Sequence, residues 1–258
     1  MTRIAIAGVT GWTGGAIASA ATAAPDITLA AGISRNAAGT EVHGAPCFAS
    51  VGDALSAADF DVLIDYTRPE LVKAHIEAAI AAGVHAVVGT SGLTAEDYRD
   101  LDTKARAAGV GVLASGNFAL TAALATRFSL MAAKYLPNFE VLDYAKTNKP
   151  DAPSGTAREL AECLGDIRQP ELGHPLDQII GERELRGGTI NGVQVHSLRL
   201  PGYSASITTE FATEGSRLTI THDAGRDASI YAEGTLLAAR RVSGFTGLIR
   251  GLDNLLDD

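Results

Sequence analysis

Residues 4–14 read IAIAGVTGWTG, a short apolar run followed by glycines at three-residue intervals. The run predicts a strand, and the glycines allow a tight turn and close approach of the backbone to a pyrophosphate at the start of a helix. Because a helix N-terminus attracts phosphate, the stretch predicts the first βαβ unit of a dinucleotide-binding domain. Its candidate cofactor-binding residues are Gly8, Val9, Thr10, Gly11, Trp12, Thr13 and Gly14.

Strands and helices alternate through the first half of the chain, which predicts a parallel sheet covered on both faces. The apolar runs at 27–33, 62–64, 86–88 and 110–114 predict the strands, and 14–23, 70–82 and 95–108 have helical spacing. After Asn117 the pattern changes. Helices are predicted at 121–135 and 228–242, and strands at 139–145, 189–199, 204–212 and 218–222, with Gly-punctuated turns after 242.

The predicted fold class is therefore α/β, with two domains. Residues 1–118 and 227–258 form an N-terminal Rossmann-like parallel-sheet domain, and 119–226 form a C-terminal α+β domain with an open mixed, largely antiparallel sheet.

Residues Ser34-Arg35 bear on the choice of cofactor. An NAD site usually carries an acid about twenty residues past the glycines, where it binds the ribose 2′-hydroxyl. This chain has no acid there, and a guanidinium suits a phosphate. The pair predicts NADPH, with NADH as the alternative, unless Arg35 is simply a solvated loop residue.

Three further loops follow predicted strands at the edge where ligands of open parallel sheets bind. They supply small side chains, N–H donors and a flat ring that suits a nicotinamide, which together predict one continuous crevice. Its additional candidate cofactor residues are Thr67, Gly89, Thr90, Ser91, Asn117 and Phe118.

Composition narrows the class of protein. The chain has 258 residues, a net charge of −9 and a pI near 5.1, which argue against nucleic acid as a partner. No apolar run is long enough for a membrane span, and the first residues lead directly into a strand rather than a signal peptide. Cys47 and Cys163 lack metal-ligand spacing. We expect a cytoplasmic protein with free thiols and no metal.

Residues 148–157 read NKPDAPSGTA and join a lysine to a helix start. Thr156 and Glu159 have the spacing of a capping box ahead of apolar positions at helical spacing. Such a start offers N–H groups to an anion, and Lys149, just upstream, adds a positive charge or a proton. The alternative is an ordinary capped helix after a proline-rich loop.

Together these motifs, above all residues 149–157, resemble the dihydrodipicolinate reductase family over nearly the whole chain. The family reduces a cyclic imine dicarboxylate with NADH or NADPH in lysine and diaminopimelate synthesis. The resemblance implies a C-terminal substrate-binding and oligomerisation domain, usually in a homotetramer. It implies Lys149 as the catalytic lysine, and Ser154, Gly155 and Thr156 as ligands of a substrate carboxylate.

The chain departs from that family at three places. Ala145-Lys146 stands where members carry two adjacent histidines, Ala205–Thr208 replaces a Gly-Glu-His-Thr stretch, and Trp12 replaces a basic residue. Lys146 becomes a candidate substrate ligand, while Tyr144, Ala145, Ile207 and Trp12 predict a more apolar wall. The histidines present are expected to be surface or core residues: His43, His75, His85, His174, His196 and His222.

Three functions are compatible with the sequence. The first is an NADPH-dependent reductase of a cyclic imine other than the lysine-pathway compound, which the lost histidines favour. The second is the 4-hydroxy-tetrahydrodipicolinate reductase of lysine and diaminopimelate synthesis. The third is a non-catalytic NADP-binding module. The substrate, the proton donor and the oligomeric state are left open at this stage.

Overall fold

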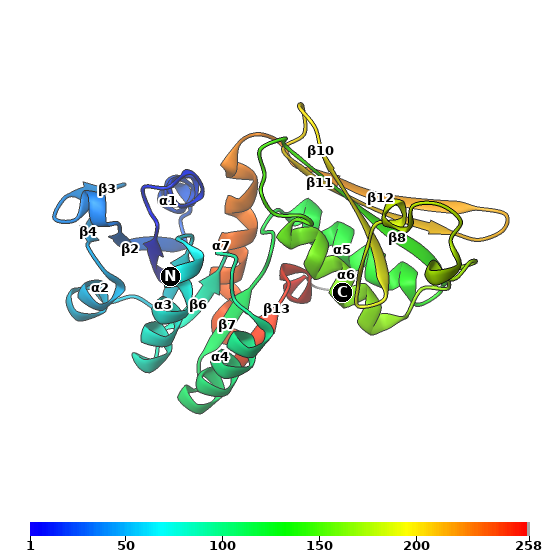
Figure 1. The fold of residues 1–258 in the computed structure, drawn as a ribbon. Coiled ribbons are helices and arrows are strands. Elements are labelled where there is room, and N and C mark those ends of the chain that lie inside the picture. Colours follow the sequence, from blue (N-terminus) through cyan, green and yellow to red (C-terminus); the bar gives the residue numbers. More distant parts are fainter. Residues whose placement is uncertain (257–258) are drawn as a thin grey trace. The chain divides into compact units, whose positions relative to one another are not determined.

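The computed structural model describes residues 1–256, which divide into two compact units (Figure 1). The first unit comprises Met1–Leu120 and the described residues from Asp227 onward, and the second Thr121–Arg226. The first is built on a parallel sheet and the second on a mixed sheet, so the predicted fold class is confirmed. No helix among the described residues is long and apolar enough to cross a membrane.

The sheet of the first unit has the strand order β13-β7-β6-β5-β1-β2-β4-β3. Its strands are β1 (Thr2–Ala7), β2 (Ile27–Ile33), β3 (Glu41–Val42), β4 (Ala45–Phe48), β5 (Val62–Asp65), β6 (His85–Val88), β7 (Gly111–Ala114) and β13 (Gly247–Arg250). All neighbouring pairs are parallel except the β3–β4 hairpin.

Helices cover both faces of this sheet, as Figure 1 shows. They are α1 (Trp12–Ala23), α2 (Val51–Ala57), α3 (Pro69–Ala81), α4 (Ala95–Ala108) and α7 (Ala232–Arg241). Helices α2, α3 and α4 enclose one apolar core, to which α3 contributes Val72 and Ile76, and α1 packs with α7. Burial on both faces explains why β5 is buried at every residue and shows no alternation.

Several elements of the first unit differ from the sequence prediction. The sequence does not predict β3, β4 or α2, because β3 has two residues, Pro46 interrupts the apolar run of β4, and α2 has only seven residues. The predicted turns after residue 242 are wrong at β13, which pairs in parallel with β7. Gly247 and Gly251, both with positive φ, bracket this strand, and glycines at each end of a short apolar run are typical of turns.

The second unit has the sheet order β12-β11-β8-β10-β9. Its elements are α5 (Leu120–Ala133), β8 (Asn138–Ala145), α6 (Gly155–Ile167), β9 (Gly188–Ile190), β10 (Val193–Arg199), β11 (Ala205–Ala212) and β12 (Arg217–Asp223). Only β8 and β10 are parallel to each other. The predicted single strand at 189–199 is wrong, because Asn191 and Gly192, both with positive φ, form the turn of a hairpin between β9 and β10.

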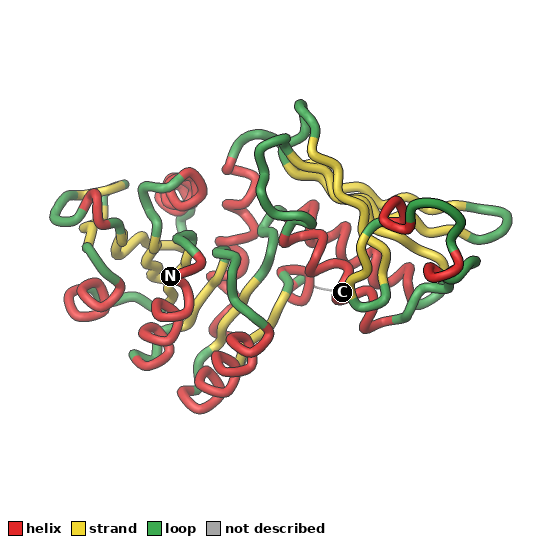
Figure 2. Tube along the Cα trace, viewed as in Figure 1, coloured by secondary structure: helices red, strands yellow, loops and turns green. Residues whose placement is uncertain are grey.

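Strand β8 shows which face of this second sheet is covered. Its residues alternate strictly between partly exposed and buried, beginning with Asn138, so Phe139, Val141, Asp143 and Ala145 share the buried face. Phe139 and Val141 belong to the same apolar core as residues of α6. Between β8 and α6 runs a segment without helix or strand, residues 146–154, which we call the lysine loop (Figure 2).

Candidate functional site

A cleft of about 410 Å³ opens in the first unit at the carboxyl ends of strands β1, β2, β4 and β5. We call it the strand-end cleft. The chain supplies its walls just after each of those strands, at Gly8, Ser34, Ala49 and Thr67. From β1 the strand order runs one way through β2 and the other way through β5. This reversal is the place where open parallel sheets bind ligands.

The glycine loop between β1 and α1 is as closely packed as a phosphate-binding turn requires. Gly8 has φ +84°, and a Cβ built on it lies 2.2 Å from the carbonyl oxygen of Tyr66. A Cβ on Gly14 would lie 2.2 Å from the carbonyl oxygen of Gly8. Helix α1 then begins after Gly11 without a side-chain cap and without an acid in its first turn. Its N-terminus therefore suits an anion.

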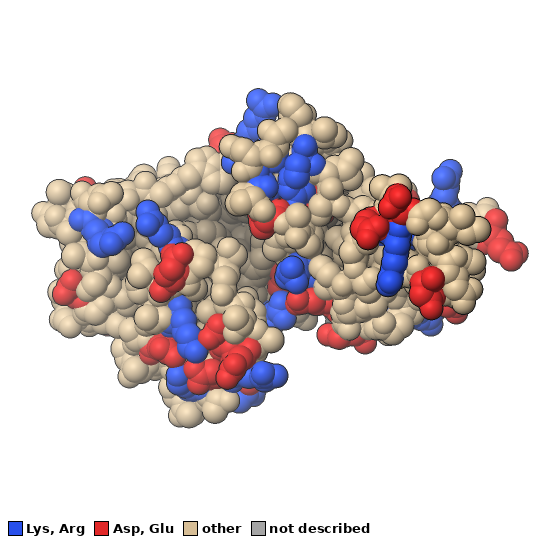
Figure 3. Space-filling view, in the orientation of Figure 1, with Lys and Arg blue, Asp and Glu red and all other residues tan. Residues whose placement is uncertain are grey.

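The polar rim of the strand-end cleft is cationic. Arg35 and Arg68 line it, both exposed, and none of the described lining residues is an aspartate or a glutamate. The hydroxyl groups of Thr10 and Ser34 lie 2.8 Å apart in a hydrogen bond, which links the loop after β1 to the loop after β2. By contrast, the charges of both signs over α3 and α4 (Figure 3) neutralise one another, as where Lys104 bridges Glu77 and Asp100.

A buried carboxylate fixes the loops beneath the cleft. Asp65, fully buried at the end of β5, accepts hydrogen bonds from the Thr67 hydroxyl at 2.7 Å and the Thr90 hydroxyl at 2.6 Å. Its second oxygen lies 2.7 Å from Nδ1 of His75. The loops after β5 and β6 are thus joined through one side chain.

The ring of Phe118 is part of the core. It is 2 % exposed and meets Tyr66 edge-to-face, with centroids 6.0 Å apart. Burial raises the pKa of the Tyr66 phenol well above its usual value, although its hydroxyl lies 2.8 Å from that of Thr235. The expectation of a flat ring presented to a nicotinamide is therefore wrong for the side chain of Phe118.

In the second unit, the lysine loop ends at the start of α6. The N-cap of this helix is Ser154, whose hydroxyl accepts from the backbone N–H of Ala157. The predicted cap at Thr156 is wrong, because Asp143 binds the backbone N–H of Ser154, which takes the cap position, and Thr156 lies inside the first turn. Lys149 is 28 % exposed and pairs with Asp151 at 2.8 Å, and Lys146 is exposed. A cation therefore precedes a helix start that attracts anions.

Comparisons with known proteins agree across the chain. Residues 2–118 match the family model "Dihydrodipicolinate reductase, N-terminus", and residues 121–256 match "Dihydrodipicolinate reductase, C-terminus". The chain belongs to the dihydrodipicolinate reductase family. The expected enzyme class, an NAD(P)H-dependent oxidoreductase, is confirmed with it, and so is a nicotinamide cofactor in general terms.

Individual relatives span most or all of the chain. The 4-hydroxy-tetrahydrodipicolinate reductase of Mycolicibacterium smegmatis is 35% identical over 256 residues, 99% of each chain. That of Bacillus mycoides is 38% identical over 216 residues, 83% of this chain and 80% of the relative. The dipicolinate-bound dihydrodipicolinate reductase from Paenisporosarcina sp. TG-14 superposes with a TM-score of 0.84 at 28% identity, covering 99% of this chain and 100% of that one.

The predicted cofactor residues fall into three groups. Six line the strand-end cleft: Gly8, Thr10, Gly11, Ser34, Arg35 and Thr67. Four others belong to the same glycine loop or the first turn of α1: Val9, Trp12, Thr13 and Gly14. The rest follow the neighbouring strands β6 and β7: Gly89, Thr90, Ser91, Asn117 and Phe118.

Sequence reasoning missed part of the cleft lining. Arg68 follows Thr67 in the same loop, and its positive charge is a signal that the sequence offers for an anion beside Arg35. Asn36 and Ser50 follow β2 and β4, and the second of these strands was not predicted. His75 lies on α3, and nothing in its spacing shows that it reaches Asp65.

The predicted apolar wall does not form as expected. Ile207 is 4 % exposed and belongs to the core beneath α6, and Tyr144 lies on the opposite face of β8 from Ala145. Among the histidines, His196 pairs with Glu140, His85 accepts from the N–H of Gly111, and His43 and His174 are exposed.

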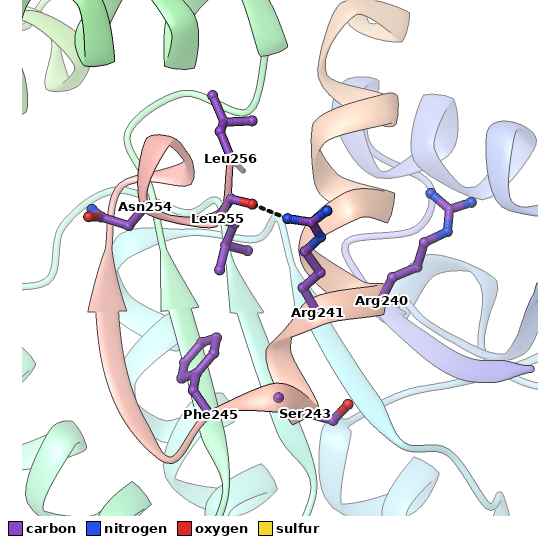
Figure 4. Close-up of a pocket in the computed structure, with 8 residues that line it drawn as sticks. Arg240, Arg241, Ser243, Phe245, Asn254, Leu255 and Leu256 are labelled. Carbon is purple, nitrogen blue, oxygen red and sulfur yellow. Dashed lines mark hydrogen bonds between the residues drawn. The ribbon is translucent and has the colours of Figure 1, made fainter. Parts of the chain in front are cut away.

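A second pocket of about 480 Å³ lies at the C-terminal segment, away from the glycine loop in sequence and lining (Figure 4). Arg241 donates to the carbonyl oxygen of Leu255, and Arg240 forms a bidentate pair with Asp26. Both arginines thus link α7 to other parts of the first unit, so these contacts give them a structural role.

Proposed function

We propose that this enzyme is an NADPH-dependent reductase of a cyclic imine that carries a carboxylate. The strand-end cleft supports the choice of NADPH. Gly8 and Gly14 leave room for the pyrophosphate beside α1, and Arg35 with Arg68 offers guanidinium groups to a 2′-phosphate with no competing acid in the lining. The first unit is then the dinucleotide-binding domain.

The second unit then binds the substrate. A substrate carboxylate accepts from the hydroxyl of Ser154, whose own N–H is bound by Asp143, and from the N–H groups of Gly155 and Thr156, while Lys146 and Lys149 supply positive charge. The nicotinamide supplies a hydride for the imine carbon. Lys149 provides positive charge, or a proton for the imine nitrogen. An imine that arrives already protonated depends less on this proton than a neutral imine does.

The observation that carries this proposal is the lysine loop, which carries Lys149 and ends at a helix N-terminus that attracts anions. The test is NADPH oxidation with three substrates: the lysine-pathway dicarboxylate, a cyclic imine with one carboxylate, and one with none. We expect turnover of at least one carboxylated imine. Turnover of the uncarboxylated imine alone contradicts the role of α6.

The lysine-pathway reaction itself is the second candidate, because the Mycolicibacterium smegmatis relative bears that name and aligns over 99% of the chain. The residues at Ala145-Lys146 separate the two candidates. Lys146→His is the clean substitution, because Lys146 is exposed, whereas Ala145 is fully buried and a larger side chain there disturbs packing.

If the enzyme prefers another imine, Lys146→His exchanges the charge of Lys146 for one histidine of the pair that family members carry at positions 145 and 146. It should then raise kcat/KM for the dicarboxylate relative to that imine by about 10-fold or more, within the range of a gained specific contact. If the wild-type enzyme already prefers the dicarboxylate, that result supports the second candidate, the lysine-pathway reaction. In either case we propose that the enzyme is a cytoplasmic homotetramer and that the second unit is its oligomerisation domain. Light scattering of the purified enzyme measures its mass and so tests the tetramer.

A further inference from the structure

One fully buried carboxylate organises the lysine loop from outside it. Asp143, on β8, is 0 % exposed, and its Oδ2 accepts from three donors: the backbone N–H of Ser154 at 2.9 Å, the Ser197 hydroxyl at 2.9 Å and Nη2 of Arg199 at 2.8 Å. Burial alone raises the pKa of Asp143. The hydrogen bonds outweigh that effect and hold the pKa below its usual value, so the side chain stays ionised.

Arg199, on the neighbouring strand β10, holds the same loop at a second point. Its Nη2 also donates to the backbone carbonyl oxygen of Asp151 at 2.6 Å, and its side chain is only 16 % exposed. Asp143 therefore fixes the end of the loop at Ser154, and Arg199 fixes it at Asp151. Both contacts are made by Nη2, while Nη1 donates to the backbone carbonyl oxygen of Leu198 at 2.9 Å. The planar guanidinium thus spreads its donors over three acceptors, an arrangement that the single ammonium of a lysine does not reproduce.

The loop so held carries the lysine of the proposed reaction. The carboxylate of Asp151 pairs with Nζ of Lys149 at 2.8 Å, and the backbone N–H of Lys149 donates to the carbonyl oxygen of Lys146 at 3.1 Å. A chain of contacts thus runs from Asp143 through Arg199 and Asp151 to Lys149. Ser154, at the other contact, is the cap of the helix that receives the carboxylate.

We propose that Asp143 and Arg199 are positioning residues that set the place of Lys149 and of the α6 N-terminus for the reaction. The inference rests on the proposed function, since it assigns the pair to the same substrate site. Arg199 acts on the reaction through Lys149. A displacement of about 1 Å in such a group costs up to about 100-fold in rate, so the effect is measurable.

The first test is a double-mutant cycle. Arg199→Lys keeps the charge, and we expect it to lower kcat about tenfold or more while the Kd for NADPH is unchanged. In a Lys149→Ala background the same substitution should cost less than about twofold, because the residue through which it acts is gone. An equal loss in both backgrounds overturns the proposal and leaves the pair a structural one.

The matched control is Arg186→Lys, which alters another arginine paired with an acid of β8, Glu140. We expect kcat to stay within about twofold of the wild type. A loss equal to that of Arg199→Lys shows that any ion pair on this strand has the same effect, which overturns the assignment. Asp143→Asn, which retains an acceptor for the Ser154 N–H but removes the charge, should lower kcat in the same direction as Arg199→Lys.

A second measurement does not depend on turnover. The rate of acylation of Lys149 by an amine-reactive reagent, followed by peptide mass spectrometry, reports its surroundings, with Lys146 as the internal reference on the same loop. Arg199→Lys should change the ratio of the Lys149 and Lys146 rates about threefold or more. If no imine is reduced, a changed ratio upholds the positioning of Lys149 while the proposed function fails, and an unchanged ratio overturns the positioning.

Discussion

The strand-end cleft and the lysine loop both place positive side chains near a helix N-terminus, but they are held by different parts of the chain. The cleft is shaped by backbone: glycines pack against carbonyl groups, and the arginines at its rim are exposed. The lysine loop is held by buried side chains from two strands, Asp143 and Arg199. A backbone-built site is sensitive to added atoms, whereas a site built from side chains is sensitive to lost charges and hydrogen bonds.

The largest effect is expected at the lysine loop. Lys149→Ala should lower kcat by at least about 100-fold, the lower end of the contribution of a general acid, while the fold and the NADPH affinity stay intact. Single-turnover and steady-state NADPH oxidation measure the loss. Circular dichroism and a cofactor titration serve as controls, and near-normal turnover removes Lys149 from the mechanism.

A backbone substitution tests the cleft. In Gly8→Ala the new Cβ meets the Tyr66 carbonyl at 2.2 Å, whereas in Gly44→Ala nothing lies within 4 Å, although φ is +79° there and +84° at Gly8. Both variants pay about 1–2 kcal/mol for the left-handed backbone, so the difference between them isolates the clash.

We expect Gly8→Ala to be less stable than Gly44→Ala by about 2 kcal/mol and to bind NADPH more weakly. Urea unfolding and a fluorescence titration measure the two quantities. Equal stability of the two variants shows that the glycine loop gives way to a side chain, and the cleft is then less rigid than its packing indicates.

The difference between the two sites also explains what the sequence could predict. Motifs such as Gly8–Gly14 are local, because the turn and the helix that use them are adjacent in the chain. The Asp143–Arg199 pair joins residues 56 apart on strands whose pairing only the fold establishes. Asp143 does stand on the apolar phase of β8, which is unusual for an acid, but no spacing rule pairs it with Arg199 on another strand.

Local rules also fail where two of them compete. Thr156 and Glu159 have capping-box spacing, yet Ser154 caps α6, because Asp143 binds the Ser154 N–H and fixes the chain there. In the same way, the glycines that bracket β13 are typical of turns, but pairing with β7 makes the segment a strand.

Cofactor choice provides a smaller effect at the rim of the cleft. NADPH should bind at least about tenfold more tightly than NADH, and Arg35→Ala should remove about tenfold of that affinity, within the 1–3 kcal/mol of lost charged hydrogen bonds. Isothermal titration with both cofactors checks it, with NADH as the control ligand. A variant that weakens both cofactors alike places Arg35 away from the 2′-phosphate.

The smallest effect is a pH dependence confined to the second unit. His222 is 4 % exposed, with Nδ1 3.0 Å from the Thr121 hydroxyl and no hydrogen-bond partner for Nε2 among residues 1–256. Burial lowers the pKa of His222, and this effect is larger than that of the negative charge of Asp223, which raises the pKa. Because the folded pKa lies below the unfolded value of about 6.5, this contribution to stability is complete above that pH and is lost as the pH falls through the folded pKa.

The free energy of unfolding should therefore fall between about pH 7 and pH 5 by no more than about 1.4 kcal/mol per pH unit from this residue. His222→Gln, which cannot take up the proton, should show a shallower dependence in urea unfolding, and His174→Gln, at an exposed histidine, is the matched control. The Kd for NADPH should differ little between wild type and His222→Gln at each pH, because His222 belongs to the second unit and the strand-end cleft to the first. Parallel stability curves for wild type and His222→Gln contradict the assignment and leave the buried histidine without an electrostatic effect on folding.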